Sequence, residues 1–409
     1  MRRVVITGLG AVSPIGNDIE ELWDSVKNGK NGIAPITRFD TSGFKIKLAG
    51  ELKGFDPEKY VEKREARKMA AFTLYARAAA DQAVTDSGLD FSAEDTDRCG
   101  VIISSGIGGL ENIESEEKRG MEKGYERVSP HFIPMAISNM AAGQVAIAHG
   151  LHGMCSCVVT ACASGTNAIG DSFRYIRDGY ADIMLAGGTE ASITPLGIGG
   201  FASMKALCDS TDPDRASVPF DAERGGFVMG EGSGILVLEE YEHAVRRGAR
   251  IYCEVIGYGA NCDAHHVTAP LPDGSGAAKC MTMALKDGNI SPEDIDYINA
   301  HGTSTKLNDS GETKAVKLAF GDHAYKLMMS STKSMTGHLL GASGAVEGVI
   351  TALSIYHGFV PATINYRVPD EECDLDIVPN AGREYDIRYA MSNSLGFGGH
   401  NASIVFKKI

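Results

Sequence analysis

The chain has 409 residues, 43% of them hydrophobic, and a formal net charge of −14 at pH 7. These values predict a soluble globular protein with two or three domain-sized units. The acidic balance excludes a general nucleic-acid binder, which needs a basic surface. Nine cysteines at irregular spacings indicate reduced thiols and a cytoplasmic protein, and not a disulfide framework.

Two apolar segments could be a signal peptide or a membrane helix. The apolar run of the N-terminus stops at Thr7 and Gly8, too soon for the apolar core of a signal peptide. Residues 128–170 contain no Asp, Glu, Lys or Arg but include prolines, histidines and amides. A membrane helix is more uniformly apolar, so this stretch predicts buried protein interior and no membrane insertion.

Along the chain, short apolar runs alternate with helical patterns. We expect buried strands at Arg2–Gly8, Cys99–Ser105, Cys155–Ala161 and Ala181–Gly188. Helical spacing covers Glu65–Ser87 and Asn167–Asp178, the second with Ile169, Phe173 and Ile176 on one face. This alternation predicts an α/β fold.

The second part of the chain echoes the first. Arg2–Val12 has a counterpart in Ala249–Asn261, and each of these is a strand that runs into small residues and a turn. Val158–Ile176 has a counterpart in Met329–Leu353, and each of these is a strand, a polar turn and a helix that begins with glycine. This predicts two related halves, residues 1–248 and 249–409. The alternative is that there is no repeat, since any two strand–helix units look alike when only their spacing is compared.

One cysteine lies where a predicted strand turns into a helix. Cys162 in "VVTACASGTNAIG" would sit near the positive end of the helix dipole, which favours a thiolate nucleophile. The alternative is a small buried apolar residue. Cys155 and Cys157 form a C-x-C pair with no second pair at ligand spacing, so we expect no metal site.

A nucleophile needs partners, and three later turns are rich in polar groups. The segment Asn299–Glu312 carries His301, Thr303 and Thr305, and Ser330–Glu347 carries Lys333 and His338 with Glu347 at its end. Met391–Ala402 contains a glycine-rich turn that allows close approach of a ligand to the backbone. Taken singly, each of these signals is weak.

Together these motifs resemble the β-ketoacyl-[acyl-carrier-protein] synthases of type II fatty-acid synthesis, most closely the synthase II subgroup. The likeness runs nearly end to end through "RRVVITGLGAVSPIGND", "TACASGTNAIGD", "NAHGTSTKLND", "SSTKSMTGHLLGASGAVE" and "SNSLGFGGHNASIVFKK". The resemblance implies a thiolase-like fold, in which two related halves form five layers in the order αβαβα.

The resemblance also implies the chemistry, a decarboxylative Claisen condensation of malonyl-carrier protein with an acyl chain held on Cys162. Backbone N–H groups of Cys162 and Phe397 would receive the oxyanion, and His301 and His338 would donate hydrogen bonds to the enolate. Lys333 would support them, with Glu347 beside it. Asp309 would be structural. No bound cofactor is expected, because the substrates arrive on the phosphopantetheine arm of acyl carrier protein.

Substrate contacts follow from the same likeness. Thr303 and Thr305 would bind the pantetheine arm, Ile107 and Phe397 would gate the acyl pocket, and Gly398 would lie beside the substrate. Phe132 and Phe201 match positions near the acyl chain, although aromatic residues in apolar runs are more often plain core. The bulky Ile107 favours medium to long acyl chains.

Two protein partners are implied, acyl carrier protein and a second copy of the chain. A basic cluster, Lys63, Arg64, Arg67 and Lys68, has partly helical spacing, and Arg127 can join it. It would dock the acidic carrier protein. The alternative is an ordinary solvated helix face. The family forms homodimers whose subunits contribute to each other's pockets.

Other classes fit less well. "GLGAVS" at Gly8–Ser13 suggests dinucleotide binding, but Ser13 replaces the third glycine. A degradative thiolase would carry a second catalytic cysteine near the C-terminus, and none follows Cys373. A standalone polyketide ketosynthase is the nearest rival. A non-catalytic chain-length-factor partner is disfavoured because such proteins usually lack the cysteine that Cys162 supplies.

Overall fold

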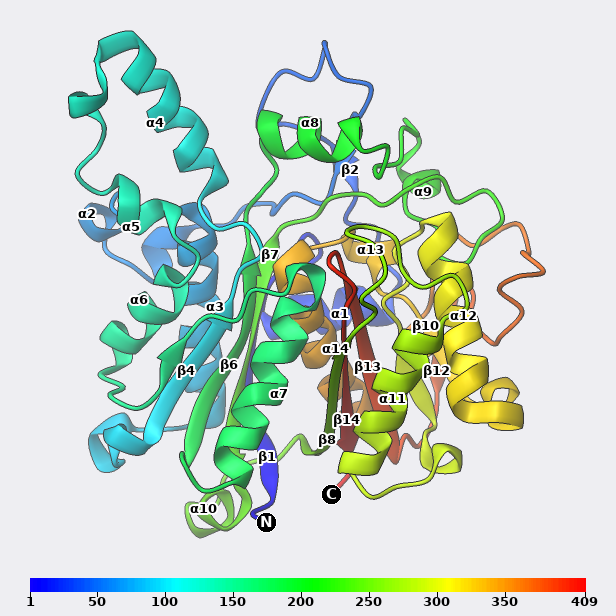
Figure 1. Ribbon diagram of the computed structural model, residues 1–409. Coiled ribbons are helices and arrows are strands. Elements are labelled where there is room, and N and C mark those ends of the chain that lie inside the picture. The colour runs from blue at the N-terminus through cyan, green and yellow to red at the C-terminus, as the bar shows by residue number, and fades with distance from the viewer.

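The computed structural model describes residues 1–409, and its core is one mixed sheet of ten strands (Figure 1). The first half of the chain contributes β1 Val4–Val12, β4 Cys99–Ser104, β5 Cys155–Ser156, β6 Ile183–Glu190 and β7 Gly232–Glu240. The second half contributes β8 Cys253–Cys262, β9 Tyr297–Asn299, β10 Met328–Ser330, β13 Tyr389–Gly396 and β14 His400–Lys407. Two small ribbons pair β2 Ala34–Pro35 with β3 Leu48–Ala49, and β11 Phe359–Val360 with β12 Arg383–Glu384.

The helices are distributed along the whole chain. The first half holds α1 Ile19–Lys27, α2 Lys63–Ala66, α3 Ala71–Ser87, α4 Leu110–Lys123, α5 Phe132–Ala136, α6 Met140–His149, α7 Ser164–Arg177, α8 Pro195–Ser203, α9 Pro213–Ala216 and α10 Tyr241–Arg246. The second holds α11 Ser275–Asp287, α12 Lys306–Phe320, α13 Lys333–Thr336 and α14 Ser343–His357. No helix is both long enough and apolar enough to cross a membrane.

The two halves of the sheet have the same topology. Their strand orders are β1-β7-β6-β4-β5 and β8-β14-β13-β9-β10, and antiparallel pairing of β1 with β8 joins them. In each half the first two pairings are antiparallel and the last two parallel. The predicted internal repeat is therefore confirmed. Residue 248 falls between α10 and β8, and a domain boundary there stays a prediction.

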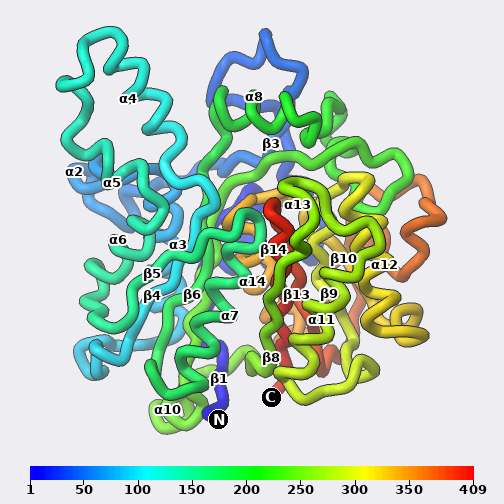
Figure 2. Tube along the Cα trace, in the orientation of Figure 1, coloured from blue at the N-terminus to red at the C-terminus, as the bar shows by residue number.

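Helices complete five layers, in the order αβαβα. The tube drawing shows α7 and α14 running between the two halves (Figure 2), and they pack on each other and on strands of both. Helix α3 covers the outer face of β1 and β7, and α11 covers that of β8 and β14. The thiolase-like architecture is therefore confirmed.

Alternating side chains build a separate core on each face of the sheet. In β7, Leu236 and Leu238 face the central helices, whereas Ile235 and Val237 face α3. Successive side chains of a strand point to opposite faces. A sheet covered on both faces needs strands that are apolar throughout, which explains why these strands were readable from the sequence.

Paired glycines let the outer helices lie close to the sheet. A Cβ at Gly8 or Gly10 would lie 2.3 or 1.9 Å from a carbonyl oxygen of α3. In the other half, a Cβ at Gly257 or Gly259 would lie 2.2 Å from a carbonyl oxygen of α11. The Gly8–Ser13 motif thus serves helix packing inside a buried strand. It is not the phosphate-binding loop of a dinucleotide site.

Three sequence expectations were wrong. The helical pattern of Glu65–Ser87 is broken between α2 and α3. The strand expected at Cys155–Ala161 is only two residues long, and its Cys155 is exposed. Parts of the uncharged stretch 128–170 lie on the surface, including Ile147, which is 74% exposed. The exposed residues lie on α5, α6 and around the edge strand β5, whereas residues 162–170 are buried.

Candidate active site

The sharp turn that carries Cys162 lies directly before α7. Residues Ala161–Ala163 form a single 3-10 turn, η5, and Ala161 has a φ of 51°. Left-handed backbone at a residue other than glycine costs energy and is kept where the surroundings enforce it. Ser164 enforces it here, since its Oγ donates to the Ala161 carbonyl (2.6 Å) and accepts from the Thr160 N–H (2.9 Å).

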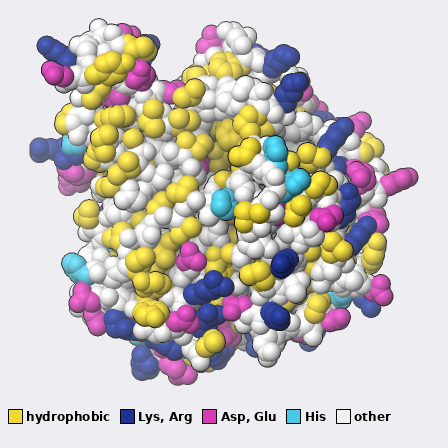
Figure 3. Space-filling model, in the orientation of Figure 1, with side chains coloured by type: hydrophobic (Ala, Val, Ile, Leu, Met, Phe, Trp, Pro, Cys, Tyr) yellow, Lys and Arg dark blue, Asp and Glu magenta, His cyan; other side chains and the backbone are white.

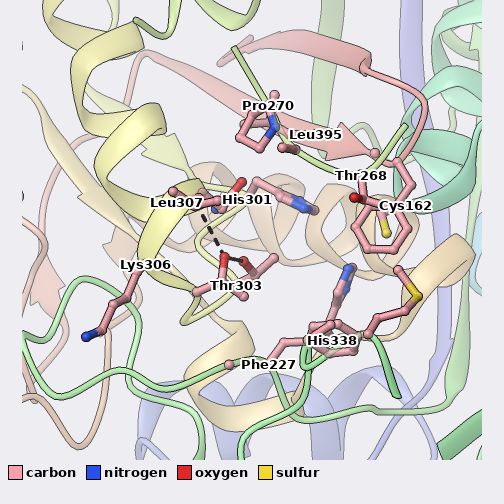
Figure 4. Close-up of a pocket in the computed structure, with 18 of the residues that line it drawn as sticks. Cys162, Phe227, Thr268, Pro270, His301, Thr303, Lys306, Leu307, His338 and Leu395 are labelled. Carbon is pink, nitrogen blue, oxygen red and sulfur yellow. Dashed lines mark hydrogen bonds between the residues drawn. The ribbon is translucent and has the colours of Figure 1, made fainter. Parts of the chain in front are cut away.

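Cys162 lines a cavity of about 420 Å³ that also receives side chains from the second half. His301 follows β9, and His338 lies between α13 and α14. Both imidazoles line the cavity and reach toward the space beside the Cys162 sulfur (Figure 4). The two halves therefore contribute three reactive side chains, one cysteine and two histidines, to the same cavity.

The two imidazoles are buried and neutral. Their ring centroids are 5.2 Å apart at 86°. Burial lowers the pKa of both His301 and His338 well below the usual value, and the Lys333 charge lowers both further. Lys333 Nζ lies 3.5 Å from His301 Nδ1, and Ser343 Oγ lies 2.8 Å from His338 Nδ1. Each ring therefore has its Nδ1 occupied, which leaves Nε2 as the free nitrogen.

Lys333 and Glu347 form a fully buried ion pair behind the histidines. Burial raises the pKa of Glu347, and the Lys333 charge opposes this. Since Lys333 also reaches His301, the pair is both structural and electrostatically connected to the cavity.

The thiol is not ionised by its helix alone. Burial raises the pKa of Cys162 to about 12, even though the Lys333 charge and the backbone N–H of Phe397 lower it. The carboxylates Glu190 and Glu347 raise it further. A dipole at a helix terminus contributes only about 1 kcal/mol, which does not offset complete burial. The expectation of a resting thiolate was therefore wrong.

Phe397 lies in a glycine turn that ends beside Cys162. The turn follows β13, and Gly398 and Gly399 adopt positive φ angles of 86° and 75°. A Cβ at Gly396 would lie 3.2 Å from the Cys162 nitrogen, so the backbones of the two turns are in contact. The Phe397 N–H points at the Cys162 sulfur. Two backbone donors therefore flank the thiol.

Comparison with family models decides the classification. The model described as the beta-ketoacyl synthase N-terminal domain matches residues 1–244, and the model of the C-terminal domain matches residues 252–367. The chain belongs to the beta-ketoacyl synthase family.

Relatives of this β-ketoacyl synthase cover its whole length. It is 53% identical to 3-oxoacyl-[acyl-carrier-protein] synthase 2 of Synechocystis and 54% identical to the protein of that name from Staphylococcus aureus, covering 100% of this chain and 98% of each relative. Among solved structures, it resembles a ketosynthase of a type II polyketide system in complex with its acyl-carrier protein, with a TM-score of 0.92 and 39% identity over 100% of this chain and 99% of that one. It also resembles a β-ketoacyl synthase from Burkholderia phymatum, with a TM-score of 0.90 and 35% identity over both full chains.

The cavity of the synthase gathers most of the residues expected from the sequence. Phe201, Thr303, Thr305 and Phe397 line it beside the cysteine and the histidines. Glu347 and Asp309 are buried outside its lining. Asp309 Oδ2 accepts from the Phe220 N–H (2.9 Å) and lies 3.7 Å from Arg224 Nε, which fits a structural role.

Three expected substrate contacts lie outside the lining. Ile107 packs in an apolar cluster with Phe201 and Phe227, next to the cavity. Gly398 is adjacent to the lining residues Phe397 and Gly399. Phe132 is half-buried on α5 and does not line this chain's cavity.

The basic cluster is not the continuous helix face that the spacing suggested. Helix α2 ends at Ala66. Lys63 pairs with Glu58 (2.8 Å) and Lys68 with Glu65 (2.7 Å), whereas Arg64, Arg67 and Arg127 are exposed and have no ion-pair partner. Three arginines therefore remain free for a partner.

Sequence reasoning missed several residues of the site. Lys205, Phe227 and Lys306 line the cavity, and Ser343 orients His338. Phe227 lies in the motif "GGFVMGEGSG", whose glycines were a visible signal. No local pattern distinguishes Ser343 from other serines at the start of a helix.

Proposed function

We propose that this β-ketoacyl synthase is an elongating 3-oxoacyl-[acyl-carrier-protein] synthase of type 2. It would move an acyl chain from carrier protein to Cys162 and condense it with malonyl-carrier protein. The single observation that carries this proposal is the shared cavity of Cys162, His301 and His338. The 53–54% identity to relatives of that name supports the substrate class.

Acylation would begin with a protonated thiol. The Cys162 sulfur attacks the thioester carbonyl, and the thiol proton passes to the departing pantetheine sulfur. A new carbon–sulfur bond forms on Cys162 as the old one breaks. The negative oxygen of the intermediate would accept hydrogen bonds from the Cys162 and Phe397 N–H groups, each worth about 3 to 4 kcal/mol in such sites.

Condensation would use the histidines as donors. The Lys333 ammonium can only donate, so His301 Nδ1 accepts and the ring proton of His301 lies on Nε2. For His338 we assign the same tautomer, with Ser343 Oγ–H donating to Nδ1. Malonyl-carrier protein then loses CO2, and the enolate oxygen accepts both Nε2–H bonds. The enolate carbon attacks the acyl carbonyl, and the Cys162 sulfur leaves as a thiolate that takes up a proton from solvent. No bound cofactor takes part in these steps.

The substrate path would follow the cavity. Thr303 and Thr305, whose hydroxyls lie 3.1 Å apart, would bind the amides of the pantetheine arm. Ile107, Phe201 and Phe397 would gate the acyl pocket, with Gly398 giving the Phe397 turn its freedom to move. Medium to long acyl chains fit a gate that must swing aside.

A homodimer would cover the exposed apolar surface near α5 and β5. Ile133, Ile137, Ile147 and Val159 are between 42% and 74% exposed, and Figure 3 shows hydrophobic side chains gathered over the α4–α6 side of the molecule. Edge strand β5 has an unpaired side, which proteins rarely leave open. Phe132 lies within this surface, so it would reach the partner's acyl pocket.

Acyl carrier protein would dock on the neighbouring basic cluster. Arg64, Arg67 and Arg127, with Lys63 and Lys68, give an otherwise acidic chain a local positive surface. Such surfaces mainly raise encounter rates and fix orientation. The nine free cysteines fit the reducing cytoplasm, where we place the enzyme.

The alternatives fit less closely. A polyketide ketosynthase shares the cysteine and histidines, but the solved polyketide relative is 39% identical against 53–54% for the synthases named above. A non-catalytic partner would not need Cys162 at a strained turn in a cavity.

Incubation with acyl- and malonyl-carrier proteins of graded chain length tests the proposal. Mass spectrometry should find an acyl adduct on Cys162 and 3-oxoacyl products longer by two carbons, and Cys162→Ala should abolish both. An adduct that persists in Cys162→Ala would contradict the assignment of the nucleophile.

A further inference from the structure

Glu190 is a buried carboxylate that the proposed reaction does not use. It is the last residue of β6 and has no exposed surface. None of the ion pairs of the structure includes it, although a buried carboxylate without a cation is costly unless hydrogen bonds satisfy it. Burial raises the pKa of Glu190, and its hydrogen bonds oppose that effect.

Five donors from three segments satisfy this carboxylate. Its Oε1 accepts from Ser105 Oγ (3.0 Å), Ser192 Oγ (3.2 Å) and the Ile107 N–H (3.3 Å), and its Oε2 accepts from the Gly106 N–H (2.9 Å) and the Gly341 N–H (3.0 Å). The turn after β4 is thereby tied to the turn that precedes α14. One side chain thus connects the proposed gate of the first half to the second half.

Gly341 is the counterpart of Cys162 in the internal repeat. Its 3-10 turn, η8 (Leu340–Ala342), precedes the serine that begins α14 just as η5 precedes the serine that begins α7. Leu340 has a φ of 49° and Ala161 one of 51°. The Gly341 N–H therefore corresponds to the Cys162 N–H, but it donates its hydrogen bond to the Glu190 carboxylate of the protein itself.

The close approach of Gly341 to Gly106 leaves no room for a side chain at either position. A Cβ on Gly341 would lie 2.3 Å from the Gly106 nitrogen, and a Cβ on Gly106 would lie 2.9 Å from Glu190 Oε2. Beside it, Ile107 and Leu340 belong to one apolar cluster with Phe227, which lines the cavity. The loops that Glu190 holds together therefore pack against the wall of the cavity.

From this geometry we infer that Glu190 is a positioning residue that sets how readily Ile107, beside the cavity, swings aside to admit an acyl chain, and hence which chain lengths are accepted. The inference rests on the proposed function. The Ile107 N–H makes the longest of the five bonds and is released first when the gate swings, while Gly106 and Gly341 stay fixed and act as the hinge.

The substitution Glu190→Gln keeps some of these five hydrogen bonds and removes others. The amide oxygen in place of Oε2 keeps Gly106 and Gly341, and the amide nitrogen in place of Oε1 donates to the hydroxyls of Ser105 and Ser192. The Ile107 N–H and the two serine O–H groups lose this acceptor; the hydroxyls can turn and accept from the amide, whereas the backbone N–H cannot. In the purified full-length protein, the ratio of Cys162 acylation rates with tetradecanoyl- and butanoyl-pantetheine should rise about fivefold, the population change that one hydrogen bond controls.

A second readout separates positioning from general structural damage. The groups that face the Cys162 thiol are Lys333, Glu190, Glu347 and the neutral pair His301 and His338, and the Glu190 charge raises the thiol pKa. Alkylation of Cys162 by iodoacetamide should therefore reach half-maximal rate at lower pH in Glu190→Gln. Glu190→Asp keeps the charge but shortens the reach, so it should change the acylation ratio without moving this midpoint.

Glu239→Gln is the matched control, since Glu239 is an equally buried carboxylate held by Thr7, His243 and Arg247 away from the cavity. It should leave ratio and midpoint unchanged. The inference is overturned if Glu190→Gln gives the wild-type ratio, or if Glu239→Gln shifts the ratio as much. Failure of the wild-type protein to be acylated by either thioester would instead contradict the proposed function, and the alkylation midpoint would still judge Glu190.

Discussion

The loops that follow β4 and β9 occupy equivalent places in the two halves, and each is held by a buried carboxylate. Glu190 accepts the N–H groups of Gly106 and Ile107 after β4, and Glu312 accepts those of His301 and Gly302 (2.8 Å each) after β9. Glu312 comes from α12 of the same half, whereas Glu190 also reaches Gly341 of the other half. The first loop is thus built to couple the halves, and the second to fix one imidazole.

The largest effect should come from the side chains that the second half places in the cavity. Replacement His338→Ala removes one of two proposed enolate donors, so the rate of condensation should fall about 10²- to 10⁴-fold. Acylation of Cys162 should fall far less, because the nucleophile and both backbone donors remain. Separate assays of acyl transfer and malonyl decarboxylation distinguish the steps, and equal losses in both would contradict this division between the halves.

The next effect concerns the buried Lys333–Glu347 ion pair of the second half. Lys333→Met leaves Glu347 charged and buried, so the free energy of unfolding should fall by about 3 to 5 kcal/mol. The double variant Lys333→Met/Glu347→Leu should recover most of that loss, since no unpaired charge remains. Urea unfolding of the single and double variants measures it. Additive losses would show that the pair does not act as a unit.

The carboxylate behind His301 should make stability depend on pH. Burial raises the pKa of Glu312 to about 7 from its usual value of 4.5, so the folded state holds the carboxyl proton more tightly than the unfolded state. Its contribution to stability is complete below pH 4.5 and is lost as the pH rises through 7, an effect of up to about 3 kcal/mol. Urea unfolding between pH 5 and 8 should show a flatter profile in Glu312→Gln, and an unchanged slope would contradict this pKa.

Repetition made much of this fold readable. Buried strands such as β4 and β6 are apolar over most of their length because helices cover both faces. The Gly-x-Gly of β1 recurs in β8 because each strand meets a helix closely. The resemblance supplied Cys162 and the histidines. Glu190 was out of reach, because its role depends on N–H groups 83 to 151 positions away in the chain.

Two failures have a common physical cause. The ionisation of Cys162 was judged from its helix terminus, but burial by the second half dominates its pKa. The stretch 128–170 was judged buried from its composition, but a single chain leaves Ile147 and Val159 exposed. Local sequence reports what a residue prefers, whereas burial depends on what the rest of the molecule, or a partner, places against it.

The smallest effect concerns the surface of the first half. The double variant Arg67→Glu/Lys68→Glu should raise KM for carrier-bound substrates a few-fold, because exposed charge pairs contribute only about 0.2 to 1 kcal/mol each. Small thioester mimics should react normally, since the cavity is untouched. A matched reversal on α11 of the second half, Lys279→Glu/Lys286→Glu, changes the net charge equally on exposed side chains and should leave KM unchanged. Equal increases in both double variants would mean that overall charge attracts the carrier protein, and equal loss with the mimics would place the defect in the cavity.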